Sequence, residues 1–238
     1  SNFINYYFND PKINKLVNFD AMYYCANETN VDENIRTNDK YILVQGNLTN
    51  HDLIQETLIK YNITHVIHFA AQSHVQNSFS DSIKFTYDNI LGTHILLDVC
   101  RKLGTINKFI HVSTDEVYGT LSLDPNDLFT ENTPYAPNSP YSASKASSDM
   151  IIRAYNETYG LNTVITNCSN NYGPKQHDEK LIPTIIRKAI SGENIPIYGD
   201  GKNVRDWLYV LDHCKGIELA FKTGKSGETY NIGGRNER

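Results

Sequence analysis

The stretch Phe109-Ile110-His111-Val112-Ser113-Thr114-Asp115-Glu116-Val117-Tyr118-Gly119 decides the fold class. It begins as a largely apolar strand and runs directly into a hydroxyl, two adjacent acids and an aromatic ring. In open α/β sheets, ligands bind at the carboxyl ends of the strands, which is where these polar residues fall. The stretch therefore predicts a functional site at the edge of a parallel sheet.

Strand-like and helix-like segments alternate on both sides of this stretch. Further strands are expected at Leu16–Phe19, Tyr41–Val44, His65–Phe69 and Thr163–Thr166, and helices from about Asp52, Ser82 and Tyr141. This alternation predicts an α/β fold of the doubly wound, Rossmann type, in which helices cover both faces of a parallel sheet.

The pattern loosens after Tyr172-Gly173-Pro174 into the shorter pieces Leu181–Ile190, Ile195–Tyr198 and Asp212–Phe221. We therefore expect a sheet domain over residues 1–174 and part of a smaller second lobe over residues 175–238. A complete dinucleotide-binding unit opens with a strand and a glycine-rich phosphate loop, and this sequence begins in what resembles the following helix. We expect an internal stretch of a longer protein, truncated at both ends.

The composition narrows the class of protein. With 238 residues the chain can bury a substantial core, and no apolar run approaches the roughly 18 residues of a membrane span. A net charge of −5 without charge blocks argues against nucleic acid or a membrane as a partner. The four cysteines are widely spaced and the histidines show no metal-ligand spacing, so we expect a reducing cytoplasm and assign no metal.

Tyr141-Ser142-Ala143-Ser144-Lys145 is a Tyr-x-x-x-Lys motif at the expected start of a helix. Spacing of four residues places the phenol and the ammonium on one helical face. A nearby cation favours the phenolate, so Tyr141 is expected to act as a base below its ordinary pKa of about 10. Alone, the motif also fits a solvated helix face.

Asp115 and Glu116 have structural readings as well, a turn cap for the first and a solvated carboxylate for the second. Following a buried strand and preceding the Tyr-x-x-x-Lys motif, they are the best acid and base candidates in the chain.

Five motifs in the same order resemble the dTDP-glucose 4,6-dehydratase family, nucleotide-sugar dehydratases of the extended short-chain dehydrogenase type. They are 113–119 (Ser-Thr-Asp-Glu-Val-Tyr-Gly), 141–145, 168–174 (Cys-Ser-Asn-Asn-Tyr-Gly-Pro), 179–183 (Glu-Lys-Leu-Ile-Pro) and 205–210 (Arg-Asp-Trp-Leu-Tyr-Val). The resemblance covers essentially the whole chain. It implies a homodimeric enzyme of deoxysugar biosynthesis, with an NAD-binding domain followed by a nucleotide-sugar-binding lobe.

The resemblance also implies roles for five catalytic residues. Tyr141, supported by Lys145, would remove the sugar 4-hydroxyl proton while a hydride passes to NAD, and Thr114 would hydrogen-bond the same oxygen. Glu116 would take the C5 proton, and a protonated Asp115 would donate to the departing 6-hydroxyl. Adjacent carboxyls suit this division because each disfavours ionisation of the other.

Cofactor and substrate residues follow from the matching positions. Besides Tyr141 and Lys145, the NAD-binding candidates are Asp20, Ala70, Ala71, Ser73 and Asn89. Besides Thr114, the substrate-binding candidates are Asn170, Glu179, Lys180, Leu181, Pro196, Tyr198 and Arg205. An acid at the end of the second Rossmann strand favours NAD over NADP, and the planar donors of arginine suit a diphosphate. Asp20 also fits a simple turn residue.

Four positions depart from the family pattern. Asn47, Gln72 and Gln76 stand where acids are usual, and Asp88 replaces a common threonine before Asn89. We expect somewhat altered cofactor contacts. Two alternatives to the dehydratase stay open: an epimerase or decarboxylase of the same fold, against which the Asp115-Glu116 pair argues, and a silent NAD-binding or sugar-binding module.

Overall fold

The computed structural model describes residues 1–122, 127–197 and 200–235. All of its strand pairs are parallel. A four-stranded sheet has the order β3 (His65–His68), β4 (Lys108–Thr114), β5 (Thr163–Cys168) and β8 (Thr229–Ile232). Two further pairs of strands are β1 (Leu16–Asp20) with β2 (Tyr41–Gln45), and β6 (Asn170–Tyr172) with β7 (Trp207–Tyr209). The five strands predicted from the sequence are confirmed, with ends within two residues of those expected.

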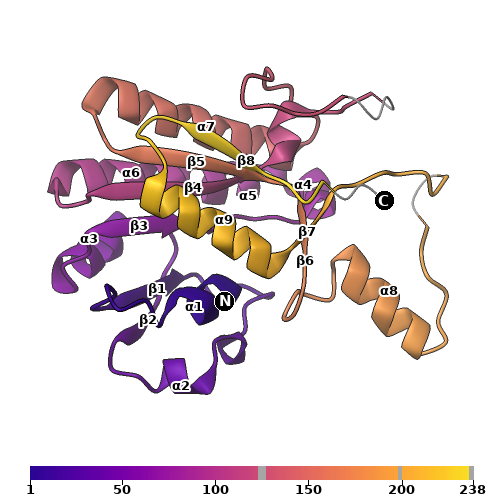
Figure 1. The fold of residues 1–238 in the computed structure, drawn as a ribbon, viewed down its shortest axis with the longest axis horizontal. Coiled ribbons are helices and arrows are strands. Elements are labelled where there is room, and N and C mark those ends of the chain that lie inside the picture. The colour runs from indigo at the N-terminus through magenta and orange to yellow at the C-terminus, as the bar shows by residue number, and fades with distance from the viewer. Residues whose placement is uncertain (123–126, 198–199, 236–238) are drawn as a thin grey trace.

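Helices cover both faces of the four-stranded sheet (Figure 1). One face carries α3 (His51–Lys60), α6 (Gly92–Leu103) and α7 (Pro140–Tyr159), and the other carries α1 (Asn2–Tyr7) and α9 (Val210–Thr223). The remaining helices are η1 (Glu28–Asn30), α2 (Glu33–Arg36), α4 (Val75–Ser80), α5 (Ser82–Phe85), the π-helical η2 (Thr86–Leu91), η3 (Asp115–Tyr118) and α8 (Leu181–Ile190). The predicted doubly wound α/β fold is confirmed.

Strand β4 divides the core between the two faces. Phe109 packs with Leu97 of α6 and Ile152 of α7, whereas the next residue, Ile110, packs with Ile217 of α9. All five side chains are at most 1% exposed, and burying each contributes about 1.5–3 kcal/mol. Because strand side chains alternate, His111 and Ser113 share the α7 side with Phe109.

The sequence also sets where α7 begins and ends. Ser139 caps its first turn through a capping box with Ser142, and Pro140 occupies the first helical position, where no backbone donor is needed. At the other end, Gly160 adopts φ 67°, a left-handed conformation that glycine tolerates. The predicted start at Tyr141 was therefore one residue late.

The expected division after Pro174 stays a prediction, and the structure distributes the following residues over two places. Helix α8 stands away from the four-stranded sheet (Figure 1). In contrast, β8 extends that sheet, with Thr229 opposite Ile165, and α9 covers one of its faces. The apolar side of α9 completes the burial of Ile110, so the sheet layer includes chain from both sides of Pro174.

Candidate active site

The end of β4 presents three polar residues in a fixed turn. Thr114 caps the 3-10 helix η3, and its hydroxyl accepts a hydrogen bond from the Glu116 amide at 3.3 Å. The same hydroxyl donates to Asp115 at 3.3 Å. Thr114 therefore takes the capping role that the sequence allowed for Asp115, and neither carboxyl is needed to cap the turn.

Gly119 closes this turn. Its φ of 97° is a conformation that residues with a side chain rarely adopt, and a Cβ there would lie 2.5 Å from the Ala136 carbonyl oxygen. The glycine thus lets the loop before α7 approach the turn that carries the acids.

The two acids have different electrostatic surroundings. Burial, and then the charge of Glu116, raise the pKa of Asp115 to about 6. Burial also raises the pKa of Glu116, but the positive charges of Arg205 and Lys180 oppose that rise. Asp115 is therefore the acid that more readily keeps its proton, and Glu116 is the one whose carboxylate is favoured by neighbouring cations.

Tyr141 and Lys145 lie one turn apart on α7 and are both buried, 9% and 3% exposed. The Lys145 ammonium donates to the Val112 carbonyl oxygen at 2.9 Å and lies 3.1 Å from His111 Nε2. Burial, followed by the charge of Glu116, raises the pKa of Tyr141 above its ordinary value. The expectation that Lys145 lowers this pKa is wrong for this structure, because the ammonium is directed to β4 and burial dominates.

The segment after β3 is fastened by a buried amide. Asn89, 1% exposed, accepts from the Gln72 amide at 2.7 Å, donates to the Gln72 carbonyl at 3.0 Å and donates to Ser144 Oγ at 2.8 Å. Its side chain therefore holds the backbone beside Ala71 and Ser73, both of which reach solvent. Asn89 acts on this segment as a positioning residue.

Asp20 is exposed at the carboxyl end of β1, and one of its carboxylate oxygens accepts from the Met22 amide at 2.8 Å. This is the turn contact that the sequence allowed as the simpler interpretation. Ala70 is likewise exposed, just beyond the end of β3. Both residues lie at strand ends, as a cofactor-binding role requires.

Three of the four departures from the family pattern meet in one cluster. The Asp88 carboxylate accepts from Gln72 Nε2 at 2.8 Å and from Asn47 Nδ2 at 3.1 Å. Asn47 also contacts the Tyr23 hydroxyl, at 2.6 Å. The sequence analysis considered these positions one by one and did not predict the cluster. The signal for it was that an acid appears at Asp88 while amides replace acids at Asn47 and Gln72.

The predicted substrate residues lie mainly on the α8 side of the molecule. Lys180 donates to the Ser73 carbonyl oxygen at 2.9 Å, and Glu179 accepts from the Tyr24 hydroxyl at 2.7 Å. Both contacts connect the start of α8 with segments that follow β1 and β3. Asn170 begins β6, opposite Trp207 of β7.

The remaining candidates are more exposed. Leu181 opens α8 with 44% of its surface exposed, Pro196 is exposed beyond that helix, and Arg205 is exposed before β7. Tyr198 lies outside the described residues. The structure thus brings Thr114, Asp115, Glu116 and Tyr141 together, places the charges of Lys180 and Arg205 near Glu116, and spreads the other candidates around this centre.

Within 1–122, 127–197 and 200–235, no three His, Cys, Asp or Glu side chains gather as metal ligands. In the same part of the chain, no helix has the length and apolarity needed to cross a bilayer.

The four-stranded sheet, its two helical layers and the polar strand ends define a Rossmann-type α/β protein. Residues 1–238 match the family model described as GDP-mannose 4,6 dehydratase. The chain belongs to that family.

Its relatives include several dTDP-glucose 4,6-dehydratases. The protein from Xanthomonas campestris pv. campestris is 47% identical over 232 residues, and that from Salmonella typhimurium is 46% identical over 239. Each match covers 94% of this chain, and 65% and 66% of the respective relative. The chain thus spans about two thirds of the length of these proteins.

Solved structures give the same picture. The dTDP-glucose 4,6-dehydratase from Bacillus anthracis in complex with NAD is 45% identical, with a TM-score of 0.90 over 100% of this chain and 72% of that one. A UDP-glucose 4-epimerase from Thermotoga maritima is 25% identical, with a TM-score of 0.88 over 100% of this chain and 74% of the other.

Proposed function

We propose that the protein is an NAD-dependent nucleotide-sugar 4,6-dehydratase that converts dTDP-glucose to its 4-keto-6-deoxy form. The observation that carries the proposal is the group at the end of β4. A carboxyl whose pKa is raised to about 6, a second carboxyl near two cations, and a buried phenol lie together there. An elimination of water needs an acid for the leaving hydroxyl and a base for the carbon-bound proton, and this pair supplies both.

NAD fits the residues at the strand ends. Asp20 offers a carboxylate acceptor, and the small side chains of Ala70 and Ala71 leave the backbone accessible to a ligand. Ser73, Tyr141 and Lys145 complete the proposed cofactor contacts, and Asn89 keeps this segment in place. The chemistry that NAD would supply when held by these residues is hydride transfer, away from C4 and back to C6.

The protein groups move the protons. Tyr141 removes the 4-hydroxyl proton as the C4–O bond becomes a carbonyl, and Thr114 hydrogen-bonds that oxygen. The ketone acidifies C5–H, so Glu116 takes the C5 proton while Asp115 protonates the 6-hydroxyl, which leaves as water. Glu116 then returns its proton to C5, which yields the 4-keto-6-deoxy sugar.

The substrate contacts follow the charge distribution. Arg205 and Lys180, whose charges reach Glu116, would hold the diphosphate region together with Glu179 and Leu181. Asn170 would contact the sugar, and Pro196 and Tyr198 the base. We place these roles in a nucleotide-sugar lobe that follows Pro174.

One experiment separates the dehydratase from the other candidates. Full-length protein is incubated with dTDP-glucose or UDP-glucose, and the alkali-induced absorbance of a 4-keto sugar is measured. UDP-glucose is included because a 43% identical Arabidopsis thaliana relative is a trifunctional enzyme with UDP-glucose 4,6-dehydratase activity in its name. We expect the keto sugar from dTDP-glucose. Formation of a 4-epimer, or no turnover with NAD bound, would refute the proposal.

The assembly is proposed to be a homodimer. Ile83, Tyr87 and Leu91 recur every four residues along α5 and η2 and are 65%, 56% and 39% exposed, and Phe79 precedes them with 59%. A second copy of the chain would bury this apolar row. Sedimentation should show a dimer that Tyr87→Glu dissociates, and a monomeric wild-type protein would contradict the proposed dimer.

A cytoplasmic location is proposed as well, and the four free cysteines agree with it.

A further inference from the structure

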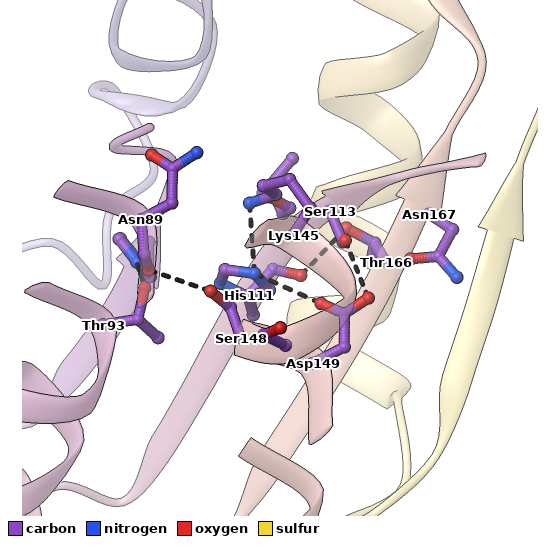
Figure 2. A network of polar contacts seen from close by, with 12 residues as sticks. Asn89, Thr93, His111, Ser113, Lys145, Ser148, Asp149, Thr166 and Asn167 are labelled. Atoms are coloured by element: carbon purple, nitrogen blue, oxygen red, sulfur yellow. Dashed lines mark hydrogen bonds and ion pairs between the residues drawn. The ribbon is translucent and has the colours of Figure 1, made fainter. Parts of the chain in front are cut away.

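A buried network of polar side chains lies between β4 and α7 (Figure 2). Lys145 Nζ is 3.1 Å from His111 Nε2, and the same ring nitrogen is 3.3 Å from Asp149 Oδ1. The other Asp149 oxygen accepts from Ser113 Oγ at 2.8 Å and from the Tyr135 hydroxyl at 3.1 Å. Lys145, His111 and Asp149 are 3%, 0% and 2% exposed, so the network is almost completely withdrawn from solvent.

The geometry leaves a shortage of hydrogen bonds at the centre of the network. A ring nitrogen carries either one proton or one lone pair, so His111 Nε2 cannot serve Lys145 and Asp149 at the same time. Among the residues that the structure describes, Asp149 Oδ1 has no hydrogen-bond partner, and neither has His111 Nδ1 on the other side of the ring. Leaving buried polar atoms unpaired is unfavourable, and a purely structural network avoids it by better pairing or by apolar side chains.

We propose that His111 and Asp149 are positioning residues for Lys145, which direct its ammonium toward the end of β4 and keep it charged. His111 limits where the amine can lie, since Nζ is held between the ring and the Val112 carbonyl. Asp149 supplies the negative charge that opposes deprotonation of the lysine.

The charge balance supports this assignment. Burial lowers the pKa of Lys145 to about 8, and the negative charge of Asp149 opposes that fall. Burial raises the pKa of Asp149 to about 7, and Lys145, Ser113 and Tyr135 oppose that rise. Burial holds the pKa of His111 well below its ordinary value, so the ring between them is neutral. Without Asp149, Lys145 would therefore lose its proton at a lower pH.

Asp149 also lines a cavity of about 260 Å³, together with Tyr135, Glu131 and Arg153. Such a volume holds water, and the lining offers it polar partners. The titratable groups around the network are His68 on β3, His111 on β4, Cys168 on β5, Tyr141 and Asp149 on α7, and Tyr118 and Tyr135 beside Asp149.

The test measures the charge of Lys145 directly, in the full-length protein with NAD. Lysine labelled at Cε is titrated by NMR, and the Lys145 signal is assigned with Lys145→Met. Asp149→Asn preserves shape and removes the charge, so the Lys145 midpoint should fall by about one pH unit, the effect of one close opposite charge. Ser148→Ala, a change beside Asp149 that removes a buried hydroxyl bonded elsewhere, should leave the midpoint unchanged.

A second variant covers the case in which Asp149→Asn does not fold. Tyr135→Phe removes one hydrogen bond that favours the Asp149 carboxylate, so it should shift the Lys145 midpoint in the same direction by less. A midpoint that neither variant moves would overturn the proposal.

The consequence for turnover rests on the proposed dehydratase function. There, the alkaline limb of the pH–rate profile should move to lower pH in Asp149→Asn by the same amount as the NMR midpoint. A shifted midpoint without any turnover of dTDP-glucose would sink the proposed function and leave the role of Asp149 intact. Turnover of dTDP-glucose together with an unshifted Lys145 midpoint would overturn the role of Asp149 and leave the proposed function intact.

Discussion

The end of β4 with α7 and the stretch from α8 to β7 both carry predicted site residues, but they hold them differently. Thr114, Tyr141 and Lys145 are at most 9% exposed, and the first and last have defined hydrogen-bond partners. In the second region Leu181 is 44% exposed and Ile190 is 83% exposed. The groups proposed for proton transfer are thus preorganised, whereas the residues proposed to bind the substrate still have surface to bury.

The most severe test of this comparison is Tyr141→Phe. Loss of the proposed base should slow C4 oxidation by about 100-fold or more, measured as reduced cofactor formed in a single turnover with dTDP-glucose. Tyr159→Phe is the matched control, because Tyr159 lies on the same helix but is 55% exposed. Equal rates in the two variants would remove Tyr141 from the chemistry.

Asp115→Asn should separate the two chemical stages at the same edge. Oxidation at C4 should persist, while water loss slows by about 100-fold because the leaving hydroxyl lacks its acid. Since the pKa of Asp115 is raised to about 6, its protonated form dominates below that pH, and wild-type elimination should slow as the pH rises through about 6. The asparagine variant should lose this limb. Oxidation and elimination that decline together would contradict the assignment.

Arg205→Lys tests the exposed region. A point charge replaces a planar, two-pronged donor, so the Michaelis constant for dTDP-glucose should rise about tenfold while kcat changes little. Lys202→Arg, three residues away on the same exposed segment, serves as the control. An unchanged Michaelis constant would assign Arg205 a structural role only.

Asp88→Ala should have the smallest effect of the four substitutions. It tests the cluster of Asn47, Gln72 and Asp88, which lies beside the segment that Asn89 holds. Gln72 and Asn47 would each lose a carboxylate acceptor, which should lower the free energy of unfolding by about 1 kcal/mol. Asp39→Ala, at an exposed position before β2, provides the reference in denaturant unfolding. Restoration by Asp88→Asn, which keeps one oxygen acceptor, should be partial. No difference between the Asp88→Ala and Asp39→Ala proteins would show that the cluster is not stabilising.

Some features of the site were predictable because they depend on local sequence. The apolar run before Ser113 predicts a buried strand, and the polar residues that follow it must then emerge at the carboxyl edge of a parallel sheet. The placement of Tyr141 and Lys145 on one face of a helix likewise follows from their spacing of four residues and from the helix start at Pro140. These relations need no knowledge of distant segments.

Other features required the packed structure, because they join residues far apart in the chain. The direction of the Lys145 ammonium depends on His111, 34 residues away, and the use of Asn89 depends on Gln72 and Ser144. The raised pKa of Tyr141 likewise reflects burial by neighbouring elements.

By itself, then, the sequence determined the alternation of strands and helices, the order of the motifs and the chemical types of the reacting groups. Only the tertiary structure decided which of these groups form hydrogen bonds with one another. It also decided that β8 and α9 complete the sheet layer, and that Asn47, Gln72 and Asp88 form one cluster. The physical reason is that periodicity and capping act within a few residues, whereas burial and hydrogen-bond pairing depend on which segments the fold brings into contact.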